Sequence, residues 1–357
     1  MVSAVKIAPP CTADALIRFA AALFRASGLA DAPAQAVAEI LVEGDLLGHD
    51  THGLALAAPY LEEIEMGAMT REGDPTVLSD LGAVAVWDGN RLPGPWLTRS
   101  AVEQACARAR RLGIAAVAIR RSHHIACLMA YLKAATDRGL MLLIASSDPS
   151  DASVAPFGGL RPLFTPDPLA IGIPTGGDPI LIDISSSITT NAMAARLRDG
   201  GGRFPGSWAI DAAGRPSDDP AVLTADPPGT LLPTGGLDHG HKGYALALGV
   251  ESLTQGLSGH GRADRPSGWG ASVLVQAFDP MAFGGADAFL RQTEWLAANC
   301  RGNPPRPGVD RVRLPGEKAL AMRRRALADG LSLRPEIVEA MRPWAVRFGV
   351  ALPCQEA

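Results

Sequence analysis

The sequence predicts an α/β fold, with an α–β layered core and a helical part formed by the two ends of the chain. Apolar residues recur at helical spacing near both ends, and short β-like runs alternate with helical stretches between them. Such alternation is typical of a layered α–β core. The chain has 357 residues, which is long for a single core. We therefore expect a helical part over 1–78, a central α–β domain over 79–290, and a helical part over 291–357 that packs on the first.

The first segment reads as three helices. Thr12 is a suitable cap for a run of apolar residues at helical spacing that ends near Phe24. A second helix begins at Asp31 and has an early proline, as helix starts often do. A third helix runs from Pro59 and ends at Gly67. Together these elements predict the helical N-terminal part.

The central segment alternates between two kinds of pattern. The strand-like runs are 83–88, 115–119, 140–145, 169–174, 180–184 and 271–278, and the helical runs are 97–112, 128–138 and 244–254. The stretch 199–240 is dense in Gly, Pro and Asp and predicts turns and long loops. The tail returns to helices over 317–329 and 334–348.

Composition excludes several classes of protein. Hydrophobic residues make up 47% and charged residues 20%, as in an ordinary folded globular protein. A net charge of −4 gives no basic field for nucleic acid. No apolar run reaches the ~20 residues of a membrane span, and the N-terminus does not resemble a signal peptide. The five cysteines are scattered without a CxxC motif, which predicts no disulfide framework and a reducing cytoplasm.

The histidines are clustered, which favours an enzyme. Six of the seven form three close pairs, namely His49 and His52, His123 and His124, and His239 and His241. Imidazole has the side-chain pKa nearest neutrality and is also the commonest metal ligand. The pairs lie in stretches rich in Gly, Ser, Thr and Asp, as catalytic residues often do. These imidazoles therefore either move protons or hold a metal.

Proton transfer is the better use of these histidines. Zinc needs three or four ligands, and no carboxylate occurs here in a familiar ligand spacing. His124 follows a predicted buried strand, at the sheet edge where α–β folds place ligands. Ser122 could orient its ring. The alternative is that His123 or His124 caps the next helix or packs in the core.

Two polar stretches could cradle phosphate groups. The run 183–190 follows a strand and offers several hydroxyl and backbone N–H groups. Lys242 begins a predicted helix, and Gly240 and Gly243 allow close backbone approach. The alternative is an ordinary helix start with a surface lysine. There is no Walker motif and no GxGxxG after an early strand, so the standard Rossmann fingerprint is missing.

Taken in order, the motifs resemble the malate/L-lactate dehydrogenase family of the second type. That family also contains ureidoglycolate dehydrogenase, sulfolactate dehydrogenase, diketogulonate reductase and piperideine-2-carboxylate reductase. The resemblance covers about residues 10 to 350. Its motifs are Gly48–Gly53 with Pro59–Tyr60, Arg120-x-Ser122-x-His124, Val154–Gly159, Asp183-x-x-x-Ser187, His241–Tyr244 with Leu257–Gly259, and Pro315–Glu317.

The resemblance implies an oxidoreductase that uses NAD or NADP, with a non-Rossmann cofactor domain, and that is usually a homodimer. It implies a small 2-hydroxy acid, or the matching 2-keto or 2-imino acid, as substrate, and no metal. The implied site residues are His124 as proton donor and acceptor with His52 beside it; Thr51, Tyr60 and Arg120 at the substrate; and Ser122, Asp183, Ser187, His241, Lys242 and Gly243 at the cofactor.

The chain departs from the family pattern around the pocket. Leu56 stands where the family has an arginine that holds the substrate carboxylate, and leucine cannot supply that bidentate contact. The other departures are Thr51 for serine, Ala126 for glycine, Thr165–Pro168 for Gly-Thr-Asn-Pro, and Ala192–Met193 for Gly-Lys. Arg120 or Arg121 is the alternative cation for a carboxylate. Two rival functions remain: a binding protein without dehydrogenase activity, and a histidine-liganded metal hydrolase.

Overall fold

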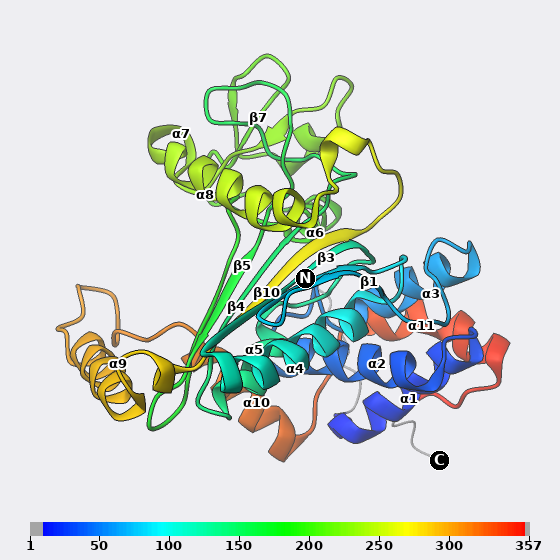
Figure 1. The fold of residues 1–357 in the computed structure, drawn as a ribbon. Helices are drawn as coiled ribbons and strands as arrows, with labels where there is room; N and C mark the ends of the chain where they lie inside the picture. Colours follow the sequence, from blue (N-terminus) through cyan, green and yellow to red (C-terminus); the bar gives the residue numbers. More distant parts are fainter. Residues whose placement is uncertain (1–9, 354–357) are drawn as a thin grey trace.

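A seven-stranded sheet forms the centre of the computed structural model, which describes residues 10–353 (Figure 1). The strand order is β1-β2-β3-β10-β4-β5-β6. Strands β2 and β3 run parallel, and every other neighbouring pair in this sheet is antiparallel. The strands are β1 Thr76–Asp80, β2 Val84–Asp88, β3 Ile114–Ser122, β4 Met141–Ser147, β5 Leu169–Ile173, β6 Ile180–Ile184 and β10 Ala271–Phe278.

Helices cover both faces of this sheet. The described helices are α1 Ala13–Ala26, α2 Asp31–Leu46, α3 Ala57–Glu65, α4 Gly94–Leu112, α5 Met129–Thr136, α6 Asn191–Asp199, α7 Gly236–His239, α8 His241–Glu251, α9 Ala286–Arg301, α10 Glu317–Asp329 and α11 Pro335–Phe348. On one face α4 packs on β3 and β10, and α5 packs on β4 and β5. On the other face α8 packs on β4 and continues into a π-helical turn, Ser252–Gly256, against β10.

The alternation of side chains along β3 explains how one strand serves both faces. Val117 and Ile119 belong to the large core that includes the terminal helices. Ala118, between them, points the other way into a small cluster with Val250 of α8 and Leu274 of β10. Successive side chains of a strand point to opposite faces. A strand buried on both sides therefore reads as a continuous apolar run, as this one does.

The two ends of the chain pack together beneath the sheet. Thr12 caps helix α1, because its hydroxyl accepts the Ala15 N–H at 3.2 Å. The helix buries Leu16 and Phe24 completely. Helix α11 contacts α1 and α3 (Figure 1). The backbone of Cys11 pairs with that of Leu331 through two hydrogen bonds. Helices from the two ends of the sequence therefore share one core.

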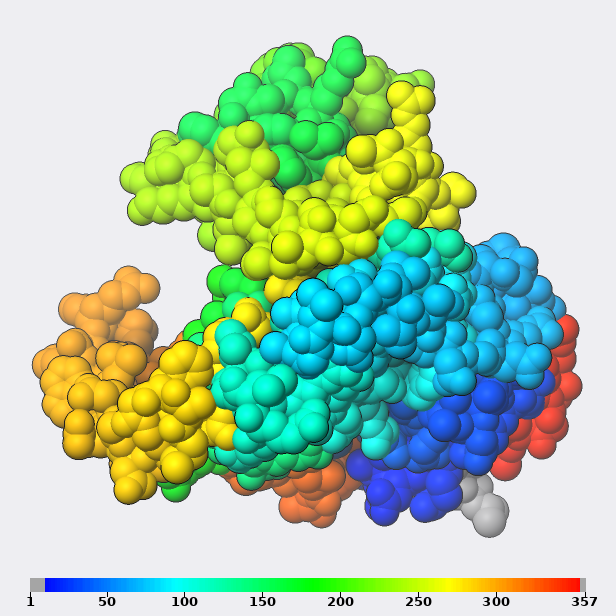
Figure 2. Space-filling view, viewed as in Figure 1, coloured from blue at the N-terminus to red at the C-terminus, as the bar shows by residue number. Residues whose placement is uncertain are grey.

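Residues about 150–165 and 185–265 form a second, smaller part above the sheet. It contains α6, α7, α8 and a three-stranded sheet in the order β8-β7-β9, with strands Ala209–Ile210, Pro216–Ser217 and Thr230–Leu231. Its own apolar cluster includes Val154, Phe164 and Phe204. Figure 2 shows this part, in green and yellow, lying on the lower body, while α9 projects on another side.

The helices and strands predicted from periodicity are found in the structure, and the omissions have identifiable causes. The stretch 199–240 is not only turns and loops, because it holds the three short strands and α7. Strands of two residues carry no periodicity. Strand β1 was missed because all five of its residues are exposed. Helix α9 was missed because it buries only Ala297 among its residues.

The cysteines differ from expectation at one position. Cys11 is disulfide-bonded, a bond that the scattered spacing of the cysteines did not predict, whereas Cys106, Cys127 and Cys300 are free thiols. Among the described helices, none is long and apolar enough to cross a membrane.

Candidate active site

A cavity of about 460 Å³ lies between the lower body and the upper part. His52 and His124 line it together with residues that follow β4, the end of β6 and the first residues of α6. The lining around His124 is apolar, with Leu56, Ile125 and Trp269. The fold therefore brings the first two histidine motifs to one enclosed space, although they are about 70 residues apart in the sequence. This is where a small molecule would be held.

A buried carboxyl group shapes the loop that carries His49 and His52. Asp45 lies near the end of α2, and its Oδ2 accepts the Leu54 N–H at 2.7 Å. A Cβ on Gly53 would lie 2.2 Å from Asp45 Oδ1, so only glycine fits there. Burial raises the pKa of Asp45 to about 8. Nothing in the motif identified Asp45 as part of the site, because its role depends on a turn that closes back on the helix.

His124 is held through one side of its ring. Its Nδ1 lies 2.7 Å from the Tyr60 hydroxyl, which also lies 3.1 Å from the carbonyl oxygen of His124. The Ala126 N–H approaches the same Nδ1 at 3.3 Å. The ring is half-buried and lines the cavity. Since Nδ1 is engaged, Nε2 is the nitrogen left available for a ligand.

The two contacts of Tyr60 are satisfied together by one tautomer of His124. A carbonyl oxygen can only accept a hydrogen bond, so the Tyr60 O–H that donates to it must accept from Nδ1–H. This leaves Nε2 without a proton, as a base requires. The rival contact, from the Ala126 N–H, is longer than the other two. Burial and the neighbouring histidines lower the pKa of His124 well below its ordinary value, so the neutral ring predominates near pH 7.

Ala126 adopts a backbone conformation that favours glycine. Its φ is +60°, in the left-handed region. Glycine, the residue of the family pattern, adopts this conformation without strain. The departure to alanine therefore falls at a position where the backbone favours glycine. The Ala126 side chain is buried, and the turn it makes aims its N–H at the His124 ring. The strained turn and the ring orientation are thus linked.

An aromatic cluster backs His124. The indole of Trp269 stacks on its ring, with centroids 4.7 Å apart and planes at 27°. Tyr60 and His123 pack against the same indole. Trp269 lies just before β10, about 145 residues from His124 in the sequence, and no motif pointed to it. The cluster limits the positions that the His124 imidazole can adopt.

His52 faces the same space. Its ring centroid lies 6.0 Å from that of His124, and its Nδ1 lies 2.9 Å from the Thr51 hydroxyl. Burial lowers the pKa of His52 to about 4. Thr51, which stands where the family pattern has serine, still supplies a hydroxyl for this contact with His52. His52 is therefore a neutral hydrogen-bonding group beside the cavity.

The first member of the second pair has a structural role. His123 is fully buried, and its Nε2 lies 3.1 Å from Glu63 Oε2. Burial lowers its pKa to about 4 despite this carboxylate. It does not line the cavity. The alternative weighed from the sequence, that one histidine of this pair packs in the core, is thus confirmed for His123 and not for His124.

The π-helical turn after α8 supports one wall of the cavity. Ser147, at the end of β4, lines the cavity, and its hydroxyl lies 2.7 Å from the Thr254 hydroxyl and 3.0 Å from Gln255 Nε2. Both partners belong to the turn Ser252–Gly256. Such turns are rare and are found at functional sites. Here the turn places two polar side chains where a regular helix would space them differently.

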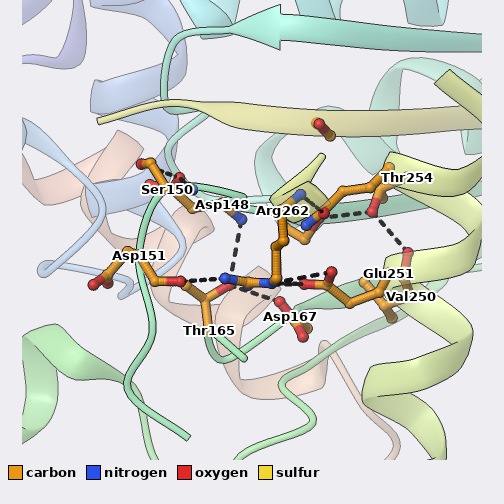
Figure 3. A network of polar contacts seen from close by, with 12 residues as sticks. Asp148, Ser150, Asp151, Thr165, Asp167, Val250, Glu251, Thr254 and Arg262 are labelled. Carbon is orange, nitrogen blue, oxygen red and sulfur yellow. Dashed lines mark hydrogen bonds and ion pairs between the residues drawn. The ribbon is translucent and has the colours of Figure 1, made fainter. Parts of the chain in front are cut away.

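Behind the same wall lies a polar network centred on Arg262 (Figure 3). Its guanidinium binds Glu251 with Nη2–Oε1 at 2.8 Å and Nε–Oε1 at 3.0 Å, and its Nη1 donates to the Asp151 carbonyl. The Thr165 hydroxyl donates to buried Asp167 at 2.6 Å. Burial raises the pKa of Asp167 to about 8. The network fixes Asp151 and Thr165, which line the cavity.

Three side chains at the cavity could hold a metal ion. A ring nitrogen of His49, the Cys127 thiol and a carboxylate oxygen of Asp183 all lie within 4.8 Å of one another. Asp183 already accepts the Met129 N–H at 2.9 Å. Nitrogen, sulfur and oxygen ligands of this kind suit zinc. The tertiary fold creates this group from three separate segments.

The remaining residues suggested by the sequence lie elsewhere. Arg120 does not line the cavity, and its Nε bonds Asp88 Oδ2 at 3.0 Å. The hydroxyls of Ser122 and Ser187 are buried and donate to backbone carbonyls. His241 and Lys242 are exposed at the start of α8. Gly243 beside them is buried, and a Cβ there would lie 2.4 Å from the Thr234 nitrogen.

Comparison with known proteins agrees with this geometry. Residues 11–342 match the malate/L-lactate dehydrogenase family. An L-lactate dehydrogenase of Cupriavidus necator is 34% identical over 89% of this chain and 91% of its own. A (2R)-3-sulfolactate dehydrogenase (NADP(+)) of Chromohalobacter salexigens is 33% identical over 92% and 95%. The crystal structure of the Δ1-piperideine-2-carboxylate reductase of Pseudomonas syringae pvar. tomato matches with a TM-score of 0.82, at 26% identity, over 94% and 99%.

The fold and the relatives define an NAD(P)-dependent oxidoreductase. The chain belongs to the malate/L-lactate dehydrogenase family. The resemblance drawn from the motifs is thereby confirmed.

Proposed function

We propose that this enzyme transfers a hydride between NAD(P) and the carbon of a small 2-hydroxy/2-keto or 2-imino compound, with His124 as proton donor and acceptor. The observation that carries the proposal is the position of His124. Its Nδ1 is engaged by Tyr60, and its ring faces a cavity of a size that holds small molecules. The relatives act on hydroxy acids and cyclic imino acids by their names.

In the oxidation direction the unprotonated Nε2 of His124 takes the proton of the substrate hydroxyl or amine. In reduction the protonated ring returns it to the oxygen or nitrogen. Tyr60 holds the ring in the tautomer that leaves Nε2 free. His52 and Thr51, which line the same cavity, offer further hydrogen bonds to the substrate. The protein thus supplies position and proton transfer.

The described residues fit a nicotinamide cofactor. The cavity joins an apolar end around Trp269 to a polar wall with Ser146, Ser147 and Thr190, and such a mixture suits a ring that bears a carboxamide. When bound, the nicotinamide supplies or accepts the hydride. Asp183 lies at the same wall. Because the large sheet is mostly antiparallel, we further propose that the cofactor domain is of a non-Rossmann kind.

Other parts of the cofactor would contact the upper part. Lys242 and His241 at the start of α8 are exposed and can meet a phosphate. Ser122 and Ser187 would act only by shaping the backbone, because their hydroxyls are already bonded internally. We retain a homodimer and a cytoplasmic location as expectations from the family resemblance.

The decisive variant is His124→Ala. It should abolish turnover while leaving the affinity for NADH and NADPH nearly intact, because the imidazole acts on the substrate and the cofactor binds through other groups. Affinity is read from the rise in melting temperature at saturating cofactor. His239→Ala, at an exposed histidine outside the cavity, is the control. Unchanged turnover in His124→Ala would falsify the role. If neither cofactor stabilises the wild type, a binding protein without dehydrogenase activity becomes the better assignment.

A further inference from the structure

The side chains that line the cavity include several acids. Among its described lining residues four are aspartates, and none is a lysine or an arginine; the aspartates are Asp50, Asp148, Asp151 and Asp183. A carboxylate taken out of water needs a cation or several hydrogen bonds to compensate for the lost hydration. No lysine or arginine among the described lining residues supplies such a cation.

The two histidines best placed for a substrate do not replace that cation. Burial lowers the pKa of His52 to about 4 and lowers that of His124 well below its ordinary value. Both rings are therefore neutral near pH 7. They can form hydrogen bonds to a substrate but cannot neutralise a negative charge without first taking up a proton.

The nearest guanidinium groups are already paired. Arg196 and Arg334 bond the two carboxylate oxygens of Asp50, each at 2.9 Å. Arg120 bonds Asp88 at 3.0 Å, and none of these three arginines lines the cavity. Moving one of them toward a substrate would break an existing ion pair. The possibility that Arg120 serves as the carboxylate partner therefore has no support in the geometry.

Leu56 occupies the wall between the two catalytic segments. It ends the 3-10 turn Leu54–Leu56, four residues after His52 and four before Tyr60. Its side chain is half-buried and lines the cavity with Ile125 and Trp269. Next to the reacting position the wall is thus apolar, and no lysine or arginine is among the described residues farther along it.

We propose that this cavity selects a substrate without a carboxylate beside the reacting carbon, namely an uncharged carbonyl compound or a cyclic imine. This inference rests on the proposed hydride transfer. In the imine case a hydride from NAD(P)H adds to the C=N carbon and a proton from His124 adds to the nitrogen. The products are an amine and NAD(P)⁺. The apolar wall at Leu56 takes the hydrocarbon substituent.

The test compares matched substrates that differ only in the carboxylate. NAD(P)H oxidation is measured with Δ1-pyrroline against Δ1-pyrroline-2-carboxylate, and with 2-butanone against 2-oxobutanoate. Pyrrolidine and proline are also titrated by calorimetry onto the enzyme saturated with NAD(P)⁺, so that binding is read even where turnover is slow. The variants are Leu56→Arg and, as a control of similar size without charge, Leu56→Met. Circular dichroism melting confirms that each variant is folded.

For the wild type and Leu56→Met, the member without a carboxylate should have the higher kcat/KM and the tighter binding, by about tenfold or more. Leu56→Arg should reverse the order, because it places a guanidinium in the wall. Preference of the wild type for the carboxylate member in turnover or in calorimetry overturns the inference and leaves the hydride transfer standing. If no member of either substrate pair supports NAD(P)H oxidation, the result counts against the proposed function. The affinities measured by calorimetry then test the selectivity by themselves.

Discussion

Replacing Tyr60 by phenylalanine removes the hydroxyl group that contacts the His124 imidazole and leaves the packing nearly unchanged. The tyrosine is fully buried, so the benzene ring keeps its volume while the hydroxyl disappears. Two hydrogen bonds are lost, one of 2.7 Å to His124 Nδ1 and one of 3.1 Å to the His124 carbonyl. His124 then keeps the stacking on Trp269 but loses the contact that selects its tautomer.

The expected loss follows from those two contacts. Each neutral hydrogen bond contributes about 0.5–1.5 kcal/mol, so together they contribute about 1–3 kcal/mol. If this energy is spent on holding the reactive tautomer, kcat falls by about 5- to 150-fold. KM for the cofactor should change little, because Tyr60 does not line the cavity. Steady-state kinetics with the best substrate of the panel above, in both directions, measure the effect.

The matched control is Tyr131→Phe. Tyr131 is also buried, and its hydroxyl donates to the backbone carbonyl of Ile125, next to His124, without touching the imidazole. The Tyr131→Phe variant should lose about as much stability as Tyr60→Phe but keep most of its turnover. The reasoning is refuted if Tyr60→Phe retains kcat within twofold of the wild type, or if both variants lose turnover equally.

Three further outcomes are expected. Burial lowers the pKa of His124 well below 6.5. The kcat/KM for oxidation should therefore stay constant from neutral pH to below pH 6.5, whereas the rate of reduction should rise as the pH falls. A bell-shaped pH profile centred near pH 7 for oxidation contradicts this. The pKa of Asp45, about 8 in the folded protein against 3.8 ordinarily, lies above its unfolded value, so its contribution to stability is complete below about pH 4 and is lost toward pH 8. Asp45→Asn keeps an oxygen for the Leu54 N–H, and it should reduce the change in unfolding free energy between about pH 4 and pH 7 by up to about 4 kcal/mol. Denaturant titrations measure that free energy at each pH, and a pH dependence equal to that of the wild type would contradict the assignment. Dialysis against EDTA should leave turnover intact. If turnover is instead lost, and if added zinc restores it in the wild type but not in Cys127→Ser, the group of His49, Cys127 and Asp183 serves a metal-dependent reaction.

Long apolar patterns were read correctly because they depend on burial alone. The runs that became β3 and β10 alternate between two packed layers, and any sequence that buries both faces of a strand must look apolar throughout. Strand β1 and helix α9 were missed because they bury little, so their sequences carry no such signal. The first histidine motif was readable because its glycines and hydroxyls mark a loop.

The partners of the motif residues were not readable. Trp269 reaches His124 only because β10 lies beside β3 in the sheet, and no local pattern encodes that neighbour. The same holds for Thr254, whose position depends on a π-helical turn. Arg120 was adjacent in sequence to the catalytic segment, yet it sits on Asp88 of the neighbouring parallel strand β2.

By itself, the sequence determined the alternation of helices and strands, the family, and the identity of the residues that can transfer protons, because periodicity and chemical type are local properties. The tertiary structure decided which histidine of the 123–124 pair faces the cavity, which nitrogen of it is free, and that the arginines near the site are already bound to carboxylates. Those facts depend on distances between segments far apart in the chain, and such distances are set only when the layers pack.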